Sequence, residues 1–134
     1  MLKACSHVTL ASNDVPRMLN FLRDAFGLEP VFENEEFGEV VLASGFRLAV
    51  FKVVGKTREF FDAAGSRGAV ALGMTVEDVD AVHARLLPLL ERYGAAVSGP
   101  PKDHPWGERS FLLIDPDGNR FEIARSPSPG GMLV

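Results

Sequence analysis

The sequence predicts an α+β fold, in which two βαβββ modules form a curled eight-stranded mixed sheet with two helices on its outside. Three observations predict it: short segments alternate apolar and polar residues, a helical period follows the first of them, and the whole pattern recurs. The chain, residues 1–134, is expected to be one domain. Its first module covers about residues 5–55 and its second about 68–125, with a connector at 56–67 and a loose tail at 126–134.

The first module begins with "HVTLAS", residues 7–12, which alternates in the manner of a half-buried strand. A helix should follow, because Asn13 or Asp14 can cap it, Pro16 suits its first turn and Gly27 can end it. The apolar residues at helical spacing are Val15, Met18, Leu19, Leu22 and Phe26.

Three strands are expected next, at residues 28–34, 38–43 and 46–54. Each is rich in apolar or β-branched residues, and Ser44-Gly45 forms the turn of a hairpin between the last two. These strands complete the first βαβββ module.

The same pattern returns in the second half, where "AVALGMTVEDVDAV" is a strand that runs into a helix. Asp78 lies 64 positions after Asp14, and Gly118 lies 73 positions after Gly45. Pro88 falls inside the second helix and is expected to bend or break it, because proline has no backbone N–H to donate.

The connector carries two further expectations. Thr57 can cap a short helix that Gly65 ends, and Phe60 and Phe61 cannot share one face of it, so that one of them packs on the domain. Cys5 is expected to be a small buried hydrophobe.

Composition narrows the class of protein. There are 14 Lys and Arg against 18 Asp and Glu, a net charge of −4, with no basic cluster, which argues against nucleic acid or an anionic membrane as partner. No apolar run is long enough for a signal peptide or a membrane span. A single cysteine fits a reducing compartment, so the expected location is cytoplasmic.

One helix covers only one face of a four-stranded sheet, so two modules side by side would leave an uncovered inner groove. Strand parity assigns to this groove His7, Thr9, Ala49, Phe51, Ala71, Gly73, Glu122 and Ala124. The opposite parity assigns to the helix-covered core Val8, Leu10, Leu48, Val50, Leu72, Met74, Phe121 and Ile123.

Three segments, "DVPRMLNFLRDAFGLEP", its echo "EDVDAVHARL" and above all "DPDGNRFEI", resemble the vicinal oxygen chelate superfamily. This superfamily includes glyoxalase I, ring-cleaving dioxygenases, fosfomycin-resistance transferases and bleomycin-binding proteins. The resemblance covers about residues 5–125 and implies the groove fold, a small-molecule ligand and a homodimer. It says much less about activity.

Metal-dependent members of that superfamily take ligands from the first and last strands of each module. The four positions carried over are His7, Ala49, Ala71 and Glu122. A catalytic divalent metal usually needs three protein ligands, so the site is incomplete, although a divalent metal stays possible. His83 is expected to be a packing histidine, and His104, in a loop, matches no ligand position.

The segment "HPWGERSF" is similar to one in bleomycin-binding members. Trp106 offers a flat face for stacking on a ligand, and Arg109 can pair with Glu122, with Glu108 or with an anionic ligand group. The structural alternative is that the tryptophan anchors a strand edge and the arginine ties down the turn. The predicted ligand-binding residues are Thr9, Phe51, Trp106, Arg109 and Phe111.

Three functions stay open. The first is a metal-independent homodimer that binds a partly apolar or aromatic small molecule. The second is an isomerase or lyase that uses His7 and Glu122 as acid and base, without metal. The third is a weakly metallated lyase, dioxygenase or thiol transferase that takes its missing ligands from substrate or water.

Overall fold

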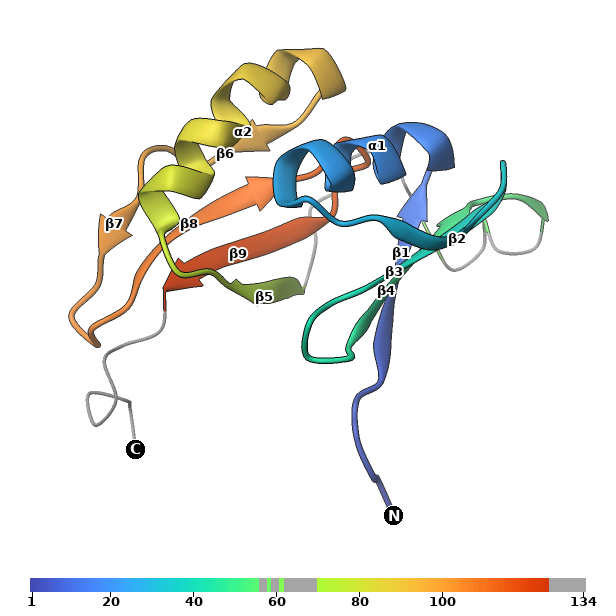
Figure 1. Cartoon of the computed structure of the whole chain (residues 1–134), viewed down its shortest axis with the longest axis horizontal. Coiled ribbons are helices and arrows are strands. Elements are labelled where there is room, and N and C mark those ends of the chain that lie inside the picture. Colours follow the sequence, from blue (N-terminus) through green and yellow to red (C-terminus); the bar gives the residue numbers. More distant parts are fainter. Residues whose placement is uncertain (56–57, 59–60, 62–69, 126–134) are drawn as a thin grey trace. The chain divides into compact units, whose positions relative to one another are not determined.

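The computed structural model describes residues 1–55, 58, 61 and 70–125 (Figure 1). The chain divides into two units, Met1–Ser66 and Arg67–Val134, each with one sheet and one helix. The predicted α+β class is confirmed. No helix in the described part of the chain is long and apolar enough to cross a bilayer.

Unit 1 has the predicted order of elements. They are β1 (His7–Ser12), α1 (Val15–Phe26), β2 (Pro30–Glu33), β3 (Phe37–Val41) and β4 (Arg47–Lys52). The four strands lie in the order β1-β4-β3-β2, with β1 parallel to β4 and the other pairs antiparallel. The first and last strands of the module are therefore neighbours, and their residues share rows across the sheet.

Unit 2 repeats this topology with one change. Its elements are β5 (Ala71–Thr75), α2 (Val79–Tyr93), β6 (Ala96–Val97), β7 (Lys102–Asp103), β8 (Arg109–Ile114) and β9 (Arg120–Arg125). The sheet order is β5-β9-β8-β6, and β7 also pairs with β8. The expected eight strands become nine in the described residues, because two short strands, β6 and β7, replace one. They form a four-stranded and a five-stranded sheet, and the single curled eight-stranded groove is not confirmed.

Both helices begin and end where the sequence predicts. The Asp14 side chain accepts a hydrogen bond from Arg17 N at 3.1 Å, and Asp78 accepts one from Ala81 N at 3.0 Å, so each aspartate caps its helix. Beyond the last turn, the chain adopts the left-handed conformation at a glycine in each unit, with φ 69° at Gly27 and 73° at Gly94.

The break expected at Pro88 does not occur, because α2 runs without interruption from Val79 to Tyr93. Pro88 lies on an exposed part of the helix. The carbonyl of Ala84, which would accept its missing N–H, therefore needs no buried partner, and one lost bond does not end the helix.

Each helix packs on one face of its own sheet, and the apolar strand residues of that face form the core. The predicted core residues that are at most 5% exposed are Leu10, Leu48, Val50, Phe121 and Ile123. Val8, Leu72 and Met74 are half-buried. On the opposite face, Ala49 and Ala124 are also buried, whereas Glu122 is exposed.

Two expectations about the rest of the chain have different outcomes. Cys5 precedes β1 and is exposed, so the expectation of a buried thiol is wrong. The Phe61 ring meets the Phe51 ring edge-on, with centroids 4.8 Å apart, and so packs on unit 1. The predicted helix cap at Thr57 and the paired Phe60 lie outside the described residues.

The turn of the "DPDGN" motif joins β8 to β9 and is held by one buried carboxylate. Asp115, 1% exposed, accepts the backbone N–H groups of Asp117 and Asn119 at 2.8 and 2.9 Å, and the Asn119 side-chain amide at 3.0 Å. Gly118 takes φ 88°, which glycine adopts without strain. Burial outweighs these hydrogen bonds and raises the pKa of Asp115 to about 6.

We predict that Gly38→Ala destabilises the fold by about 1 to 3 kcal/mol. A methyl group at Gly38, on β3, would overlap the Cδ1 atom of Leu19, a core residue of α1 that is 1% exposed. Gly73→Ala is the matched control on β5, because a methyl group there meets no atom within 4 Å and its effect should stay within about 0.5 kcal/mol. Urea unfolding measures both, and equal stabilities of the two variants would contradict the prediction.

We also predict that Asp115 makes stability depend on pH. Its pKa of about 6 lies above the ordinary value of 3.8, so between these pH values the folded state binds more protons than the unfolded state. The contribution of Asp115 to the free energy of unfolding should therefore rise as the pH falls from 7 to 4, by up to about 3 kcal/mol. Asp115→Asn cannot titrate. Urea unfolding curves at several pH values should show that the free energy of unfolding of wild type, relative to that of this variant, increases as the pH falls. A difference between the two that does not change with pH would exclude the effect.

Candidate functional site

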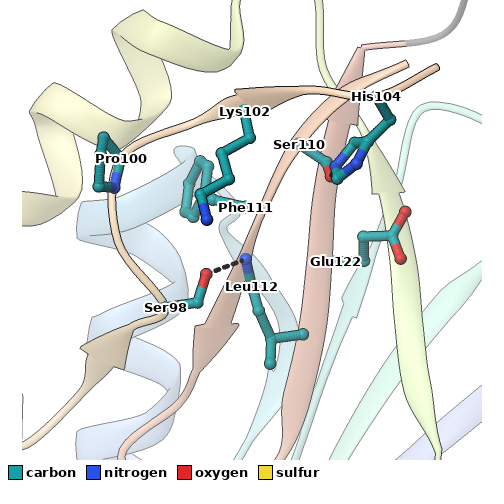
Figure 2. Close-up of a pocket in the computed structure, with 8 residues that line it drawn as sticks. All are labelled: Ser98, Pro100, Lys102, His104, Ser110, Phe111, Leu112 and Glu122. Carbon is teal, nitrogen blue, oxygen red and sulfur yellow. Dashed lines mark hydrogen bonds between the residues drawn. The ribbon is translucent and has the colours of Figure 1, made fainter. Parts of the chain in front are cut away.

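The sheet of unit 2 carries a pocket of about 230 Å³ along β8 (Figure 2). The residues that line it are Ser98, Pro100, Lys102, His104, Ser110, Phe111, Leu112 and Glu122. All of them belong to unit 2. The pocket therefore combines an apolar part with hydroxyl, amine, imidazole and carboxyl groups.

The pocket follows from a mismatch in strand length. Val97 of β6 pairs with Leu113, and Lys102 of β7 pairs with Ser110, so residues 98–101 stand opposite only two residues of β8. The extra chain must loop away from the sheet. Ser98 keeps the looped chain attached, because its Oγ accepts the backbone N–H of Leu112 at 3.0 Å, as Figure 2 shows.

The turn between β7 and β8 supplies the aromatic side of the site. His104 and Trp106 stack almost in parallel, with ring centroids 4.5 Å apart and planes at 8°. His104 Nε2 lies 2.8 Å from Ser110 Oγ, and Trp106 Nε1 donates to Glu108 at 3.4 Å. The imidazole is thus fixed from two sides, while Trp106 remains 44% exposed.

Glu122, on β9, lies in one row with Gly73 and Leu112 on the sheet face opposite α2. Partial burial and the neighbouring Glu108 carboxyl group raise the pKa of Glu122, and His104 opposes the shift. Glu122 is therefore a groove-side acid, as parity predicts, whose neighbours are Glu108 and His104.

His7 belongs to unit 1 and has other neighbours. Its Nδ1 lies 2.8 Å from Ser6 Oγ and 3.3 Å from Arg47 Nη2, and Arg47 in turn forms an ion pair with Glu39 at 3.3 Å. Arginine only donates hydrogen bonds, so Nδ1 accepts and a neutral ring carries its proton on Nε2. A metal at Nε2 would move that proton to Nδ1, against the Arg47 donor.

Arg109 forms ion pairs with other residues of unit 2 and is not among the residues that line the pocket. It donates two hydrogen bonds to Asp80, at the start of α2, at 2.8 and 3.0 Å, and forms an ion pair with Asp103 at 3.2 Å. These contacts lower the pKa of Asp80 and raise that of Arg109. The partners expected from the sequence, Glu108 and Glu122, are not the ones it bonds here, which matches the structural alternative for this arginine.

The remaining predicted ligand-binding residues are distributed over both units. Phe111 lines the pocket, but it is 3% exposed and its ring lies edge-on to His83 at 5.1 Å. This contact agrees with a packing role for His83. Thr9 is exposed on β1 in unit 1, and Phe51 lies in the same unit on β4.

The ligand set of a catalytic metal does not fit the residues present. The ligand positions are His7 and Ala49 in unit 1, and Ala71 and Glu122 in unit 2, so each unit keeps one ligand-type side chain. Taken by itself, neither unit brings three or more His, Cys, Asp or Glu side chains of the described residues into a group that could hold a metal ion. Two protein ligands fall short of three.

Sequence reasoning missed several residues of the site. Parity could have found Ser110, which pairs with Ala124. Ser98 and Lys102 depend on the looped chain, and the only signal for it is "SGPP", a glycine and two prolines that interrupt a strand pattern.

Comparison with known structures supports the same fold over nearly the whole chain. A glyoxalase-related enzyme from Fulvimarina pelagi is 28% identical, covers 99% of this chain and 97% of its own, and has a TM-score of 0.76. FosX, a fosfomycin resistance protein from Listeria monocytogenes, is 20% identical with a TM-score of 0.74, covering 98% of this chain and 95% of that one.

The bleomycin-binding protein of Streptomyces verticillus is 23% identical with a TM-score of 0.64, covering 94% of this chain and 99% of that one. Among curated proteins there is no match. The family model described as "Glyoxalase/Bleomycin resistance protein/Dioxygenase superfamily" matches residues 4–123. This match, over most of the chain, shows that the chain belongs to the glyoxalase/bleomycin resistance protein/dioxygenase superfamily.

Proposed function

We propose that this protein binds a small, partly apolar or aromatic molecule in the pocket of unit 2, without a catalytic metal. The observation that carries the proposal is the pocket itself, in which Phe111, Leu112 and Pro100 stand beside groups that form hydrogen bonds. Such a combination of apolar walls with a few fixed polar groups is typical of small-molecule sites.

The size of the pocket limits the ligand. Its 230 Å³ lies below the range of roughly 300 to 1,000 Å³ typical of drug-sized ligands, so a compact molecule, or one end of a larger molecule, fits it. Trp106, half-exposed beside the pocket, offers a flat surface for an aromatic part of the ligand that extends beyond it.

Two proteins of this fold with bound small molecules support a binding function. The Streptomyces verticillus protein is a bleomycin-binding protein, observed in complex with copper(II)-bleomycin. A mutant of the Listeria FosX was observed with Mn(II) and 1S,2S-dihydroxypropylphosphonic acid. The alanines at Ala49 and Ala71 favour the metal-independent mode for this chain.

A second candidate is acid-base catalysis without metal, in an isomerase or lyase. Glu122 lines the pocket next to His104, and its raised pKa suits a carboxyl group that exchanges a proton with a bound molecule. The partner of Glu122 in this proposal is His104, from the same unit, in place of His7.

We predict that a thermal-shift screen of aromatic acids, aromatic amines and antibiotics finds a compound that raises the unfolding temperature. Because Trp106 is the only tryptophan, its fluorescence should report the same binding. Leu112→Trp, which fills the pocket, should weaken binding at least about tenfold, equal to about 1.4 kcal/mol. Leu87→Trp, on an exposed part of α2, is the matched control and should bind as wild type does.

Two results of this screen would count against the proposal. If wild type and Leu112→Trp bind a compound equally, the ligand site lies outside this pocket. If no compound in the screen stabilises the protein, the proposed binding function is contradicted. The metal-independent part is tested by titration with Mn²⁺, Zn²⁺ and Ni²⁺. One tightly bound ion per chain, whose removal by a chelator abolishes ligand binding, would contradict it.

We further propose that the protein works as a cytoplasmic homodimer. Apolar side chains of the β2 and β3 region are exposed: Val31 by 64%, Phe32 by 53% and Val41 by 41%. A second copy would remove this surface from water. Light scattering on the purified protein should give twice the mass of the 134-residue chain, and Phe32→Glu should shift it toward the monomer; a monomeric wild type would refute the dimer.

A further inference from the structure

We infer, on the basis of the proposed binding function, that the ligand of the unit 2 pocket carries an anionic group and a cationic group at opposite ends of a short apolar spacer. The anionic group binds at Lys102 and Ser98, and the cationic group binds at Glu122 and Glu108. The ligand class is thus a zwitterion such as an ω-amino acid.

The anion end consists of donors that meet at one side of the pocket. Figure 2 shows the Lys102 side chain directed into the pocket toward Ser98 and the Leu112 backbone. Ser98 Oγ already accepts the Leu112 N–H, so its own hydroxyl hydrogen is available to donate. An ammonium group and a hydroxyl group together are a suitable pair of donors for a carboxylate.

The cation end has the opposite character. Glu122 lines the pocket, and the Glu108 carboxyl group is near enough to act on it electrostatically. Two neighbouring carboxylates repel each other, and an ammonium group between them would replace this repulsion with two attractions. Trp106 donates to Glu108 and lies beside it, so its ring adds an aromatic surface next to the bound cation.

The spacing of the two ends follows from the sheet. Lys102 lies on β7 and Glu122 on β9, on either side of β8, and two strand spacings are about 10 Å. Between them, the same face of β8 carries Leu112, which has no polar side-chain atom, and Ser110, whose Oγ lies 2.8 Å from His104 Nε2. Charges on adjacent atoms of a ligand would not reach both ends, whereas an apolar spacer would cross this floor.

The charged side chains at the two ends of the pocket are free of an ion pair with each other. Among the residues that the structure describes, no ion pair joins Lys102 to Glu122. Arg109 is held by Asp80 and Asp103, and Arg120, two residues before Glu122, donates to the carbonyl of Gly118. A ligand with both charges therefore satisfies the two ends at once, which a simple acid or amine does not.

The test uses four probes with the wild-type protein: 6-aminohexanoate, hexanoate, hexylamine and glycine. Dissociation constants are measured by NMR titration of the ¹⁵N-labelled chain, which also maps the contacted residues. We expect 6-aminohexanoate to bind about tenfold more tightly than hexanoate or hexylamine, and glycine to bind more weakly than 6-aminohexanoate. The largest shifts should fall on the pocket residues.

Variants assign each charge to its end. Lys102→Gln should reduce 6-aminohexanoate to the affinity of hexylamine, and Glu122→Gln should reduce it to that of hexanoate. Both positions are exposed, so the variants should unfold at the wild-type temperature. Lys52→Gln and Glu33→Gln, exposed strand residues of unit 1, are the matched controls and should change no affinity.

The outcomes separate this inference from the proposed function. Probes that bind in the pocket with equal affinity whatever their charges, or variants that leave the preference intact, would overturn the zwitterion and keep the binding function. If neither these probes nor the compounds of the thermal-shift screen bind in the pocket, both are overturned.

Discussion

Strand β8 is the element on which the site depends. Its six residues pair on one side with β9 and on the other with both β6 and β7. Because four residues, 98–101, stand opposite two, the chain cannot stay flat, and the hydrogen bonds on each side of the loop hold it in place. The pocket is thus a consequence of how the backbone strands pair.

Most of the fold could be predicted because it rests on local chemistry. Aspartate caps, glycine ends and alternating strands act over a few residues, so Asp14, Asp78, Gly27 and Gly94 are where the sequence indicates. Pro88 shows the limit of local rules, since a long helix packed on a sheet tolerates one missing hydrogen bond when the proline faces water.

The site could be predicted only in part. Alternation places Glu122 on the sheet face opposite α2, because parity needs no knowledge of distant residues. The neighbours of a side chain across strands depend on register, and register depends on the loop at 98–101. For that reason Glu108 and His104 emerge as the partners of Glu122 only from the structure, and Arg109 turns to Asp80.

Corresponding positions of the two units carry different residues, and the chemistry of the two sheets differs for that reason. Glu39 pairs with Ala49 in unit 1, while Leu112 pairs with Glu122 in unit 2, so each sheet has one acid in that row, on different strands. In unit 1, Arg47 forms an ion pair with Glu39 and also lies within hydrogen-bonding distance of His7. The corresponding arginine of unit 2, Arg120, donates instead to the carbonyl of Gly118 in the turn. The acid of unit 2 is thereby left beside a second carboxyl group and an imidazole, an arrangement that favours a bound cation or proton transfer over a structural ion pair.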